Sequence, residues 1–248
     1  MLTATKSKPF ERWFTIYNRY YLIGRRFRSF GMTGNVDPPD AGDRPVLYMM
    51  NHSTWWDGLL VCLAVRQRSV REHYMMMEER QLRRYGFFRK LGAYSIDRER
   101  PADIRASLRY TASLLRQGAG AWIFPQGEIR HVEERPLRFK PGIGLILKLV
   151  PQTVVVPVTL YHGFGRHEKP EASIRFGDPL LLPWRELTSR SIADTLEMGL
   201  TEQLDQHKGW LVNSPSGSPR GLEPLIRTGK SVNERFEAWK DFGAGLWR

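Results

Sequence analysis

A histidine and an aspartate stand five positions apart in the stretch NHSTWWDG at residues 51–58. A neutral histidine can accept a proton from a hydroxyl group near pH 7, and a carboxylate on its other ring nitrogen fixes the tautomer and stabilises the imidazolium. Residues five apart on one helix point about 140° apart, so His52 and Asp57 meet only if His52 lies in a loop and Asp57 begins a helix. By itself the pattern favours a capping Asp57 beside an unrelated histidine.

Two further stretches carry charged residues where strands are expected to end. FPQGEIR (124–130) contains Gly127, whose turn offers backbone amides to an oxyanion or a phosphate, and Arg130, which can pair with an anion through two hydrogen bonds. GAYSIDRER (92–100) places Arg98 at a strand end, where open α/β sheets bind ligands. Taken singly, Arg98 is better explained by an ion pair with Asp97 or Glu99, and Arg130 by an ion pair with Glu128 or Glu133.

The elements that must position these residues alternate along the chain. Short apolar or β-branched runs predict strands at 46–50, 73–77, 93–97, 121–124, 153–160 and 172–176. Helical spacing, with Pro101 at one start and Gly118 at the following end, predicts helices at 57–65, 101–118, 142–150 and 191–207. This alternation predicts an α/β fold with a mostly parallel, twisted sheet flanked by helices.

Residues 9–30 predict an amphipathic N-terminal helix. Its aromatic residues recur at spacings of three and four, and five arginines lie among them. Such a helix suits docking on a membrane surface, with aromatic rings at the interface and cations toward the headgroups. It also suits packing of the aromatic face on the domain, and the two uses can coexist.

The composition indicates a folded protein with an anionic partner. Lys and Arg total 38 against 26 Asp and Glu, a net charge of +12, which suits nucleic acid, an anionic membrane or phosphorylated substrates. The aromatic content of 12% argues against a disordered basic tail. Cys62 is the only cysteine, so no intramolecular disulfide can form and a reducing compartment fits. We expect no secretion signal and no transmembrane helix.

We divide the 248 residues into three parts. Residues 1–34 form the amphipathic membrane-associated segment, and residues 35–212 form the α/β domain. Residues 213–248 form a linker rich in Pro, Gly and Ser, followed by a short amphipathic tail with Phe236, Trp239, Phe242 and Trp247.

Four of these stretches together resemble a known family. NHSTWWD (51–57), GAYSIDR (92–98), FPQGEIR (124–130) and VVPVTL (155–160) resemble, in order and spacing, the four sequence blocks of the glycerolipid acyltransferases. RFKPG (138–142) is similar to the F-K-x-G element that follows the third block. The type member of that family makes phosphatidic acid from lysophosphatidic acid.

The resemblance implies a mechanism without a metal, a cofactor or an acyl-enzyme. His52 would deprotonate a lipid hydroxyl and Asp57 would orient it. The alkoxide would attack an acyl thioester carried by coenzyme A or by acyl carrier protein. The second-block arginine of the family, which holds the acceptor's phosphate, corresponds to Arg98. We expect the protein at the cytoplasmic face of a membrane, in contact with anionic lipid through its N-terminal segment.

The third block departs from the family form F-P-E-G-T-R. Gln126 replaces the glutamate, Glu128 replaces the threonine, and Arg130 comes one residue late because Ile129 stands at the arginine position. Gln126 can still hydrogen-bond a hydroxyl, but it carries no charge. Lys140 is a third candidate cation for a phosphate. The first acceptor to consider is therefore 1-acylglycerol-3-phosphate, and the alternative is an uncharged lipid hydroxyl, as on a glycolipid or a carotenoid.

Trp55 and Trp56 fit two interpretations equally, the wall of an acyl channel and packing of the helix start. Other classes find less support. The G-x-S-x-G elbow of serine hydrolases does not occur, and the six histidines are scattered. A non-catalytic membrane-associated or RNA-binding protein remains as an alternative, although no RNA-binding motif occurs and we expect no nucleic acid partner.

Overall fold

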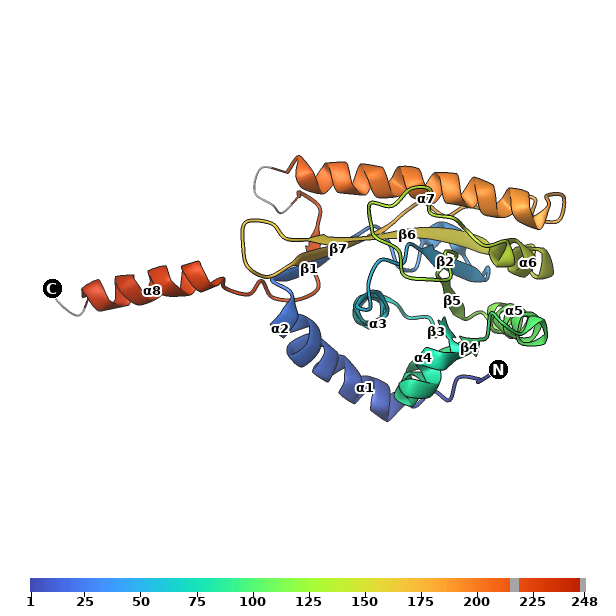
Figure 1. Cartoon of the computed structure of the whole chain (residues 1–248), viewed down its shortest axis with the longest axis horizontal. Helices are drawn as coiled ribbons and strands as arrows, with labels where there is room; N and C mark the ends of the chain where they lie inside the picture. Colours follow the sequence, from blue (N-terminus) through green and yellow to red (C-terminus); the bar gives the residue numbers. More distant parts are fainter. Residues whose placement is uncertain (215–218, 246–248) are drawn as a thin grey trace.

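The protein is built around one eight-stranded sheet (Figure 1). The computed structural model describes residues 1–214 and 219–245. The strands are β1 (Ser29–Thr33), β2 (Val46–Met50), β3 (His73–Glu78), β4 (Ala93–Ile96), β5 (Gly120–Ile123), β6 (Val154–Gly163), β7 (Glu171–Phe176) and β8 (Glu223–Pro224). Their order across the sheet is β4-β3-β5-β2-β6-β7-β1-β8. The strands from β4 to β6 are parallel, β7 is antiparallel to β6, β1 is parallel to β7, and β8 is antiparallel to β1.

Helices cover both faces of the sheet. They are α1 (Lys8–Tyr17), α2 (Gly24–Arg26), α3 (Asp57–Arg68), α4 (Glu79–Arg84), α5 (Pro101–Arg116), α6 (Gly142–Leu149), α7 (Ser189–Val212) and α8 (Val232–Gly245). A π-helix, Asn18–Ile23, joins α1 to α2, and short 3₁₀ helices span Pro39–Ala41 and Gly86–Leu91. Leu60 and Leu63 of α3 pack in one core, and Leu108 of α5 and Leu200 of α7 pack in the other. The predicted α/β fold is confirmed.

The six predicted strands and the four central helices are all present, each with an end shifted by no more than a few residues. The predicted helix at 9–30 extends too far. Its helical part ends at Arg26, and Ser29–Thr33 instead form β1 between β7 and β8. Phe30 and Met32 of β1 are buried in the same core as α3, and backbone pairing with β7 and β8 makes this segment a strand.

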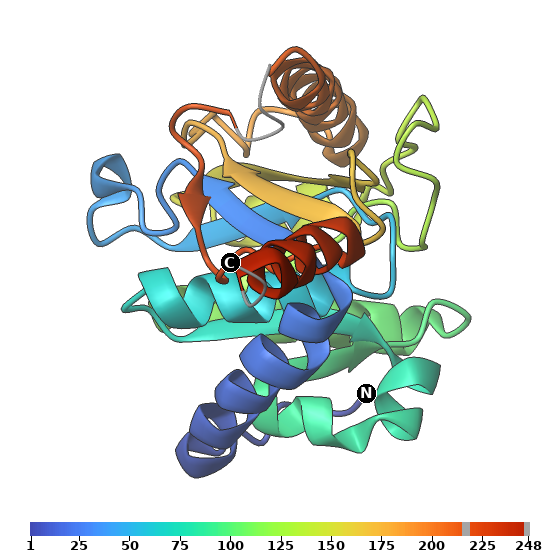
Figure 2. The ribbon, with the colours of Figure 1, turned by 90° about the vertical axis from the view of Figure 1, so that its left-hand side faces the viewer.

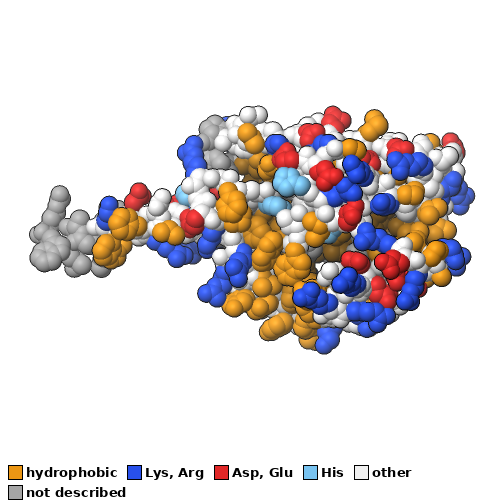
Figure 3. Space-filling model, in the orientation of Figure 1, with side chains coloured by type: hydrophobic (Ala, Val, Ile, Leu, Met, Phe, Trp, Pro, Cys, Tyr) orange, Lys and Arg blue, Asp and Glu red, His pale blue; other side chains and the backbone are white. Residues whose placement is uncertain are grey.

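The N-terminal helix has two apolar faces with different surroundings. Phe14 and Ile23 are buried against the domain, and the Asn18 amide donates to the Leu59 carbonyl oxygen at 2.8 Å. The opposite face exposes Trp13, Ile16, Tyr20 and Tyr21, each more than half accessible to solvent. Figure 3 shows hydrophobic side chains gathered over this part of the molecule, with Lys and Arg around them.

The C-terminal helix α8 projects from the body of the protein (Figures 1 and 2). The Arg28 guanidinium holds its first turn by donating to both Glu234 carboxylate oxygens, at 2.7 and 2.9 Å. Phe236 and Trp239 are exposed on it, as expected for an amphipathic tail. The Trp247 and Phe242 side chains of that prediction, and residues 215–218 of the linker, lie outside the described residues.

One buried histidine links β6, β7 and α7. His207 of α7 is fully buried, with Thr159 Oγ1 3.0 Å from its Nδ1 and Ser173 Oγ 2.9 Å from its Nε2. Burial lowers the pKa of His207 to about 4, below its ordinary value. The unfolded chain therefore binds a proton below about pH 6.5 that the folded protein does not bind, so stability falls as the pH drops from 6.5 toward 4.

We predict that His207→Gln reduces the loss of stability in acid. Without this histidine, the difference in the free energy of unfolding between pH 6.5 and pH 5 should shrink by about 2 kcal/mol, since one pKa unit corresponds to about 1.4 kcal/mol. Urea unfolding at both pH values measures this difference. His131→Gln, at an exposed histidine, is the control and should leave the pH dependence unchanged. An equal pH dependence in His207→Gln and the wild type would contradict the prediction.

Candidate active site

His52 and Asp57 meet at the carboxyl end of β2. The loop after Met50 carries His52, and α3 begins at Asp57, as predicted. The distance from His52 Nδ1 to Asp57 Oδ2 is 2.8 Å. The Asp57 side chain is fully buried, whereas the His52 side chain is 22% exposed. This geometry places the Nδ1 proton on the aspartate side and leaves Nε2 free to accept a proton.

The Asp57 carboxylate is held by the loop that it closes. The backbone N–H groups of Ser53 and Thr54 donate to Oδ2 at 2.6 and 3.0 Å, and the Thr54 hydroxyl donates to Oδ1 at 2.7 Å. A carboxylate in the first turn of a helix also interacts favourably with the helix dipole. Asp57 is the first residue of α3, after the N-cap residue Trp56, and its side chain bonds the preceding loop rather than the amides of the helix. The interpretation of a helix-capping Asp57 beside an unrelated histidine is therefore wrong, because one carboxylate binds both this loop and the His52 ring.

The third block fixes the other side of His52. The Gln126 side-chain oxygen accepts the His52 backbone N–H at 2.6 Å, and the His52 carbonyl accepts the Arg130 backbone N–H at 2.9 Å. The Phe124 ring stacks on the imidazole with ring centroids 4.2 Å apart. Gln126 is buried and does not line the cavity beside His52, so it acts here through the backbone of the histidine loop.

A cavity of about 1360 Å³ opens beside the imidazole. Besides His52, its lining includes five of the sequence-predicted site residues: Trp55, Arg98, Gly127, Glu128 and Lys140. Gly127 has a φ of +75°, a left-handed conformation that favours glycine, and a Cβ there would lie 3.5 Å from the Arg98 guanidinium. The second and third blocks thus meet at this turn.

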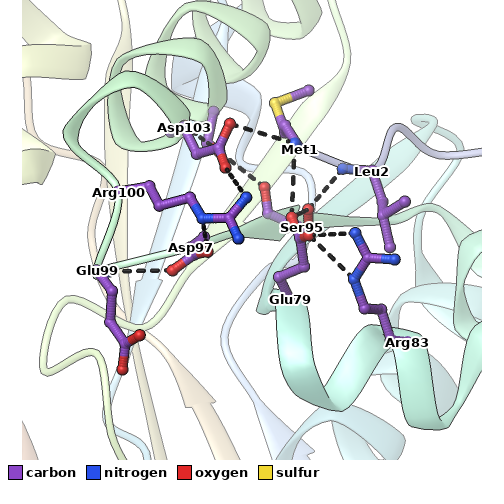
Figure 4. Close-up of polar contacts among 10 residues, drawn as sticks. Met1, Leu2, Glu79, Arg83, Ser95, Asp97, Glu99, Arg100 and Asp103 are labelled. Atoms are coloured by element: carbon purple, nitrogen blue, oxygen red, sulfur yellow. Dashed lines mark hydrogen bonds and ion pairs between the residues drawn. The ribbon is translucent and has the colours of Figure 1, made fainter.

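The two candidate arginines differ in their partners. The nearest carboxylate to Arg98 is Glu78, at 3.7 Å on an exposed surface. Its expected partner Asp97 pairs instead with Arg100, at 3.3 Å, beside the Glu79–Arg83 ion pair (Figure 4). Arg98 is therefore only weakly paired, which leaves its guanidinium available to an anion.

The Arg130 guanidinium forms ion pairs with two glutamates. Its guanidinium pairs with Glu128 and, at 2.5 Å, with Glu134, and it does not line the cavity. The hydrogen bond from Arg130 is the main cause that lowers the pKa of Glu128. The ion pair with Glu128, expected from the sequence as the simpler explanation of Arg130, is present.

The two tryptophans have different surroundings. Trp55 is exposed and lines the cavity, so it fits the interpretation as a channel wall. Trp56 packs against the core, with its ring edge-on to Phe27 at 5.4 Å, so it fits the interpretation as packing of the helix start.

Two residues near the pair were missed in the sequence. Phe124 supports the imidazole, and His162 Nε2 lies 3.4 Å from the Ser53 hydroxyl. Burial lowers the pKa of His162, and the Asp57 charge opposes that shift. His162 follows the fourth block by two residues, so its place at the end of β6, next to β2, was a usable signal. Within residues 1–214 and 219–245, no cluster of three metal-ligating side chains occurs.

The fold is α/β, and a histidine–carboxylate pair lies at the carboxyl end of the interior strand β2. A family model described as Acyltransferase matches residues 31–161, more than half of the chain, so the protein belongs to the Acyltransferase family and is an acyltransferase. No curated protein matches the chain significantly.

We predict that His52→Ala abolishes acyl transfer while the protein stays folded. Loss of a general base costs roughly 10²- to 10⁴-fold in rate. Asp57→Asn should lower turnover strongly as well, because an amide favours the wrong histidine tautomer. The rate of thiol release from an acyl thioester, with circular dichroism for the fold, measures both effects. His131→Ala is the matched control at an exposed histidine. A folded His52→Ala protein with near-normal activity would refute the assignment.

Proposed function

We propose that the protein transfers a fatty acyl group from an acyl thioester, on coenzyme A or acyl carrier protein, to a lipid hydroxyl, and that its acceptor is 1-acylglycerol-3-phosphate. The observation that carries the proposal is the 2.8 Å contact between His52 and Asp57 at the wall of a large cavity. The family membership and the four sequence blocks support the same reaction.

The proposed reaction needs no covalent enzyme intermediate. His52 Nε2 removes the proton from the acceptor hydroxyl as the oxygen attacks the thioester carbonyl, and Asp57 stabilises the imidazolium that forms. The tetrahedral intermediate then collapses, the carbon–sulfur bond breaks, and the imidazolium returns its proton to the leaving thiolate. The products are the new ester and a free thiol, with His52 neutral again.

A phosphate on the acceptor would lie at the Gly127 turn of the third block, where that block meets Arg98 of the second block. Arg98 and Lys140 both line the cavity next to Gly127, and Arg98 has only a long ion pair to replace. A guanidinium can bind a phosphate through two hydrogen bonds, and a lysine adds a second charge. These two cations are the basis for a phosphorylated acceptor.

One observation favours the second candidate, an uncharged lipid hydroxyl such as that of a glycolipid or a carotenoid. The third block supplies no free cation, because Arg130 is paired with two glutamates and Gln126 bonds the histidine loop. Of the three candidate cations identified in the sequence, only Arg98 and Lys140 then line the cavity.

We predict that Arg98→Ala separates the two candidates. For a phosphorylated acceptor, the substitution should raise the acceptor KM at least tenfold and leave the donor KM nearly unchanged, because a charge-assisted bond is lost. Arg130→Ala is the matched control, since its guanidinium does not line the cavity. Kinetics on 1-acylglycerol-3-phosphate and on a neutral monoacylglycerol measure the effect. An equal effect of Arg98→Ala on both acceptors would favour the uncharged acceptor.

We also propose that the exposed face of α1 and the π-helix docks on an anionic membrane. Trp13, Tyr17 and Tyr21 stack in succession, with ring centroids 5.4 and 5.0 Å apart. Arg19 and Arg25 lie over the neighbouring tyrosine rings. Aromatic rings with adjacent cations suit the interface between headgroups and acyl chains. No helix among the described residues is long and apolar enough to cross a membrane.

We predict that Trp13→Ala combined with Tyr20→Ala releases the protein from liposomes that contain anionic lipid. Both side chains are more than half exposed, so the fold should survive, and salt should weaken the binding of the wild type. Removal of the whole segment is a poor test, because Phe14 and Ile23 belong to the core. Met198→Ala on α7, at another exposed apolar side chain, is the control in liposome sedimentation. Equal sedimentation of the double variant and the control would contradict the docking.

A further inference from the structure

The first turn of α3 lies between the catalytic pair and the N-terminal helical segment, residues 8–26. Asp57 begins this turn, and its carboxylate lies 2.8 Å from the His52 ring. Gly58 and Leu59, the next two residues, line the cavity. The N-terminal helical segment contacts the same turn. A shift of the turn therefore moves Asp57 relative to His52.

The N-terminal helical segment runs beside α3 in the opposite direction (Figure 1). Near the start of the segment, Glu11 pairs with Arg66 in the last turn of α3. Farther along the segment, Asn18 Nδ2 donates to the Leu59 carbonyl oxygen in the first turn of α3, at 2.8 Å. Asn18 therefore makes a polar contact at the catalytic end of α3.

The Asn18 amide is completely buried, but only half of it has a partner. Because a carbonyl oxygen only accepts hydrogen bonds, the amide nitrogen must face Leu59. Among residues 1–214 and 219–245, Asn18 Oδ1 finds no hydrogen-bond donor. A buried oxygen without a donor destabilises the folded protein, and the helix already offers the Leu59 carbonyl the N–H group four residues later. Stability of the core therefore does not explain an asparagine at this position.

The π-helix brings Asn18 to this contact. In an α-helix, Phe14 and Ile23 would point about 180° apart, because each residue turns the helix by about 100°. Both side chains are nevertheless buried. The wider turn from Asn18 to Ile23 takes up more residues than an α-helical turn, so it directs both of these residues toward the domain. Phe14, Asn18 and Ile23 thus share one buried face.

Gly24 allows the π-helix to form. Its N–H donates to the Arg19 carbonyl oxygen, five residues earlier, which is the hydrogen bond of a π-helix. A Cβ at Gly24 would lie 2.6 Å from that oxygen, so any larger residue would force the turn apart. Single π turns within helices occur often at functional sites, and this one begins with the residue that contacts the helix of Asp57.

We propose that Asn18 is a positioning residue for acyl transfer, whose hydrogen bond holds the first turn of α3 where Asp57 reaches His52. This inference rests on the proposed function, with these two side chains as the catalytic pair. Asn18 does not line the cavity, so it acts on the reaction through α3. Small displacements matter at such a site, since a misplacement of about 1 Å can lower a rate roughly 100-fold.

The test is Asn18→Leu, which keeps the branched shape of the side chain and removes both the donor and the unpartnered oxygen. The protein should stay about as stable as the wild type, while kcat falls about tenfold, the loss for a displacement of a fraction of an ångström. The KM values for donor and acceptor should stay unchanged, because neither substrate contacts residue 18. A residue with a merely structural role would change stability and leave kcat of the folded protein unchanged.

Thr15→Val is the matched control on the same segment. The Thr15 hydroxyl donates to the Glu11 carbonyl of its own helix at 2.7 Å and makes no bond to α3, so this variant should keep the wild-type kcat. The assay measures transfer from the best of a series of acyl-CoA donors to a water-soluble, short-chain 1-acylglycerol-3-phosphate. A soluble acceptor keeps docking on a membrane out of the comparison, and thermal unfolding reports the stability of each variant.

Gly24→Ala is a second route to the same contact, because it disturbs the π-helix that presents Asn18. It should lower kcat as well, and the double variant with Asn18→Leu should lose no more than the weaker single variant, since both act through one hydrogen bond. Gly24→Ala decides the question if Asn18→Leu does not fold. A folded variant with wild-type kcat, or a loss confined to KM, would overturn the proposal. Absence of transfer by the wild type from every donor would instead refute the proposed function.

Discussion

The Asp57 carboxylate, buried at the start of α3, is the constraint on which the rest of the site depends. It accepts the backbone N–H groups of Ser53 and Thr54, the Thr54 hydroxyl and the His52 ring. A buried charge without these donors would be costly, so the loop has little freedom to rearrange. Since this loop also carries His52 to the cavity wall, one set of hydrogen bonds determines the loop shape, the helix start and the direction of the imidazole.

The sheet supplies the second part of this arrangement. Parallel strands have their carboxyl ends on the same side of the sheet. The sequence blocks that follow β2, β4 and β5 therefore meet there, although up to about 80 residues separate them in the sequence. Gly127 allows the turn after β5 to approach Arg98, and the third-block backbone bonds the histidine loop directly. The third block therefore contacts the histidine loop through Gln126 and the Arg130 backbone N–H.

Hydrophobic periodicity along the sequence predicted the strands and the central helices, because those elements depend mainly on neighbouring residues. The six apolar runs became strands. The loop-to-helix spacing allowed His52 and Asp57 to meet, but the resemblance of the four blocks was needed to expect that contact. Strand β1 was not predictable in the same way, because its partners β7 and β8 lie far along the chain and its residues continue an aromatic helical pattern. The different surroundings of Trp55 and Trp56 and the burial of Gln126 depend on tertiary packing, which no local spacing contains.

The place of β1 in the sheet also has a consequence for how the chain folds. Ser29–Thr33 pair with Glu171–Phe176 and with Glu223–Pro224, residues that leave the ribosome much later. Contacts of such high sequence separation form slowly, because a long loop must close before they form. The β4-β3-β5-β2 half of the sheet depends on shorter separations and can assemble first. During synthesis β1 is therefore without its sheet partners for most of the chain's elongation, and its buried residues Phe30 and Met32 are the ones most in need of a chaperone or a lipid surface.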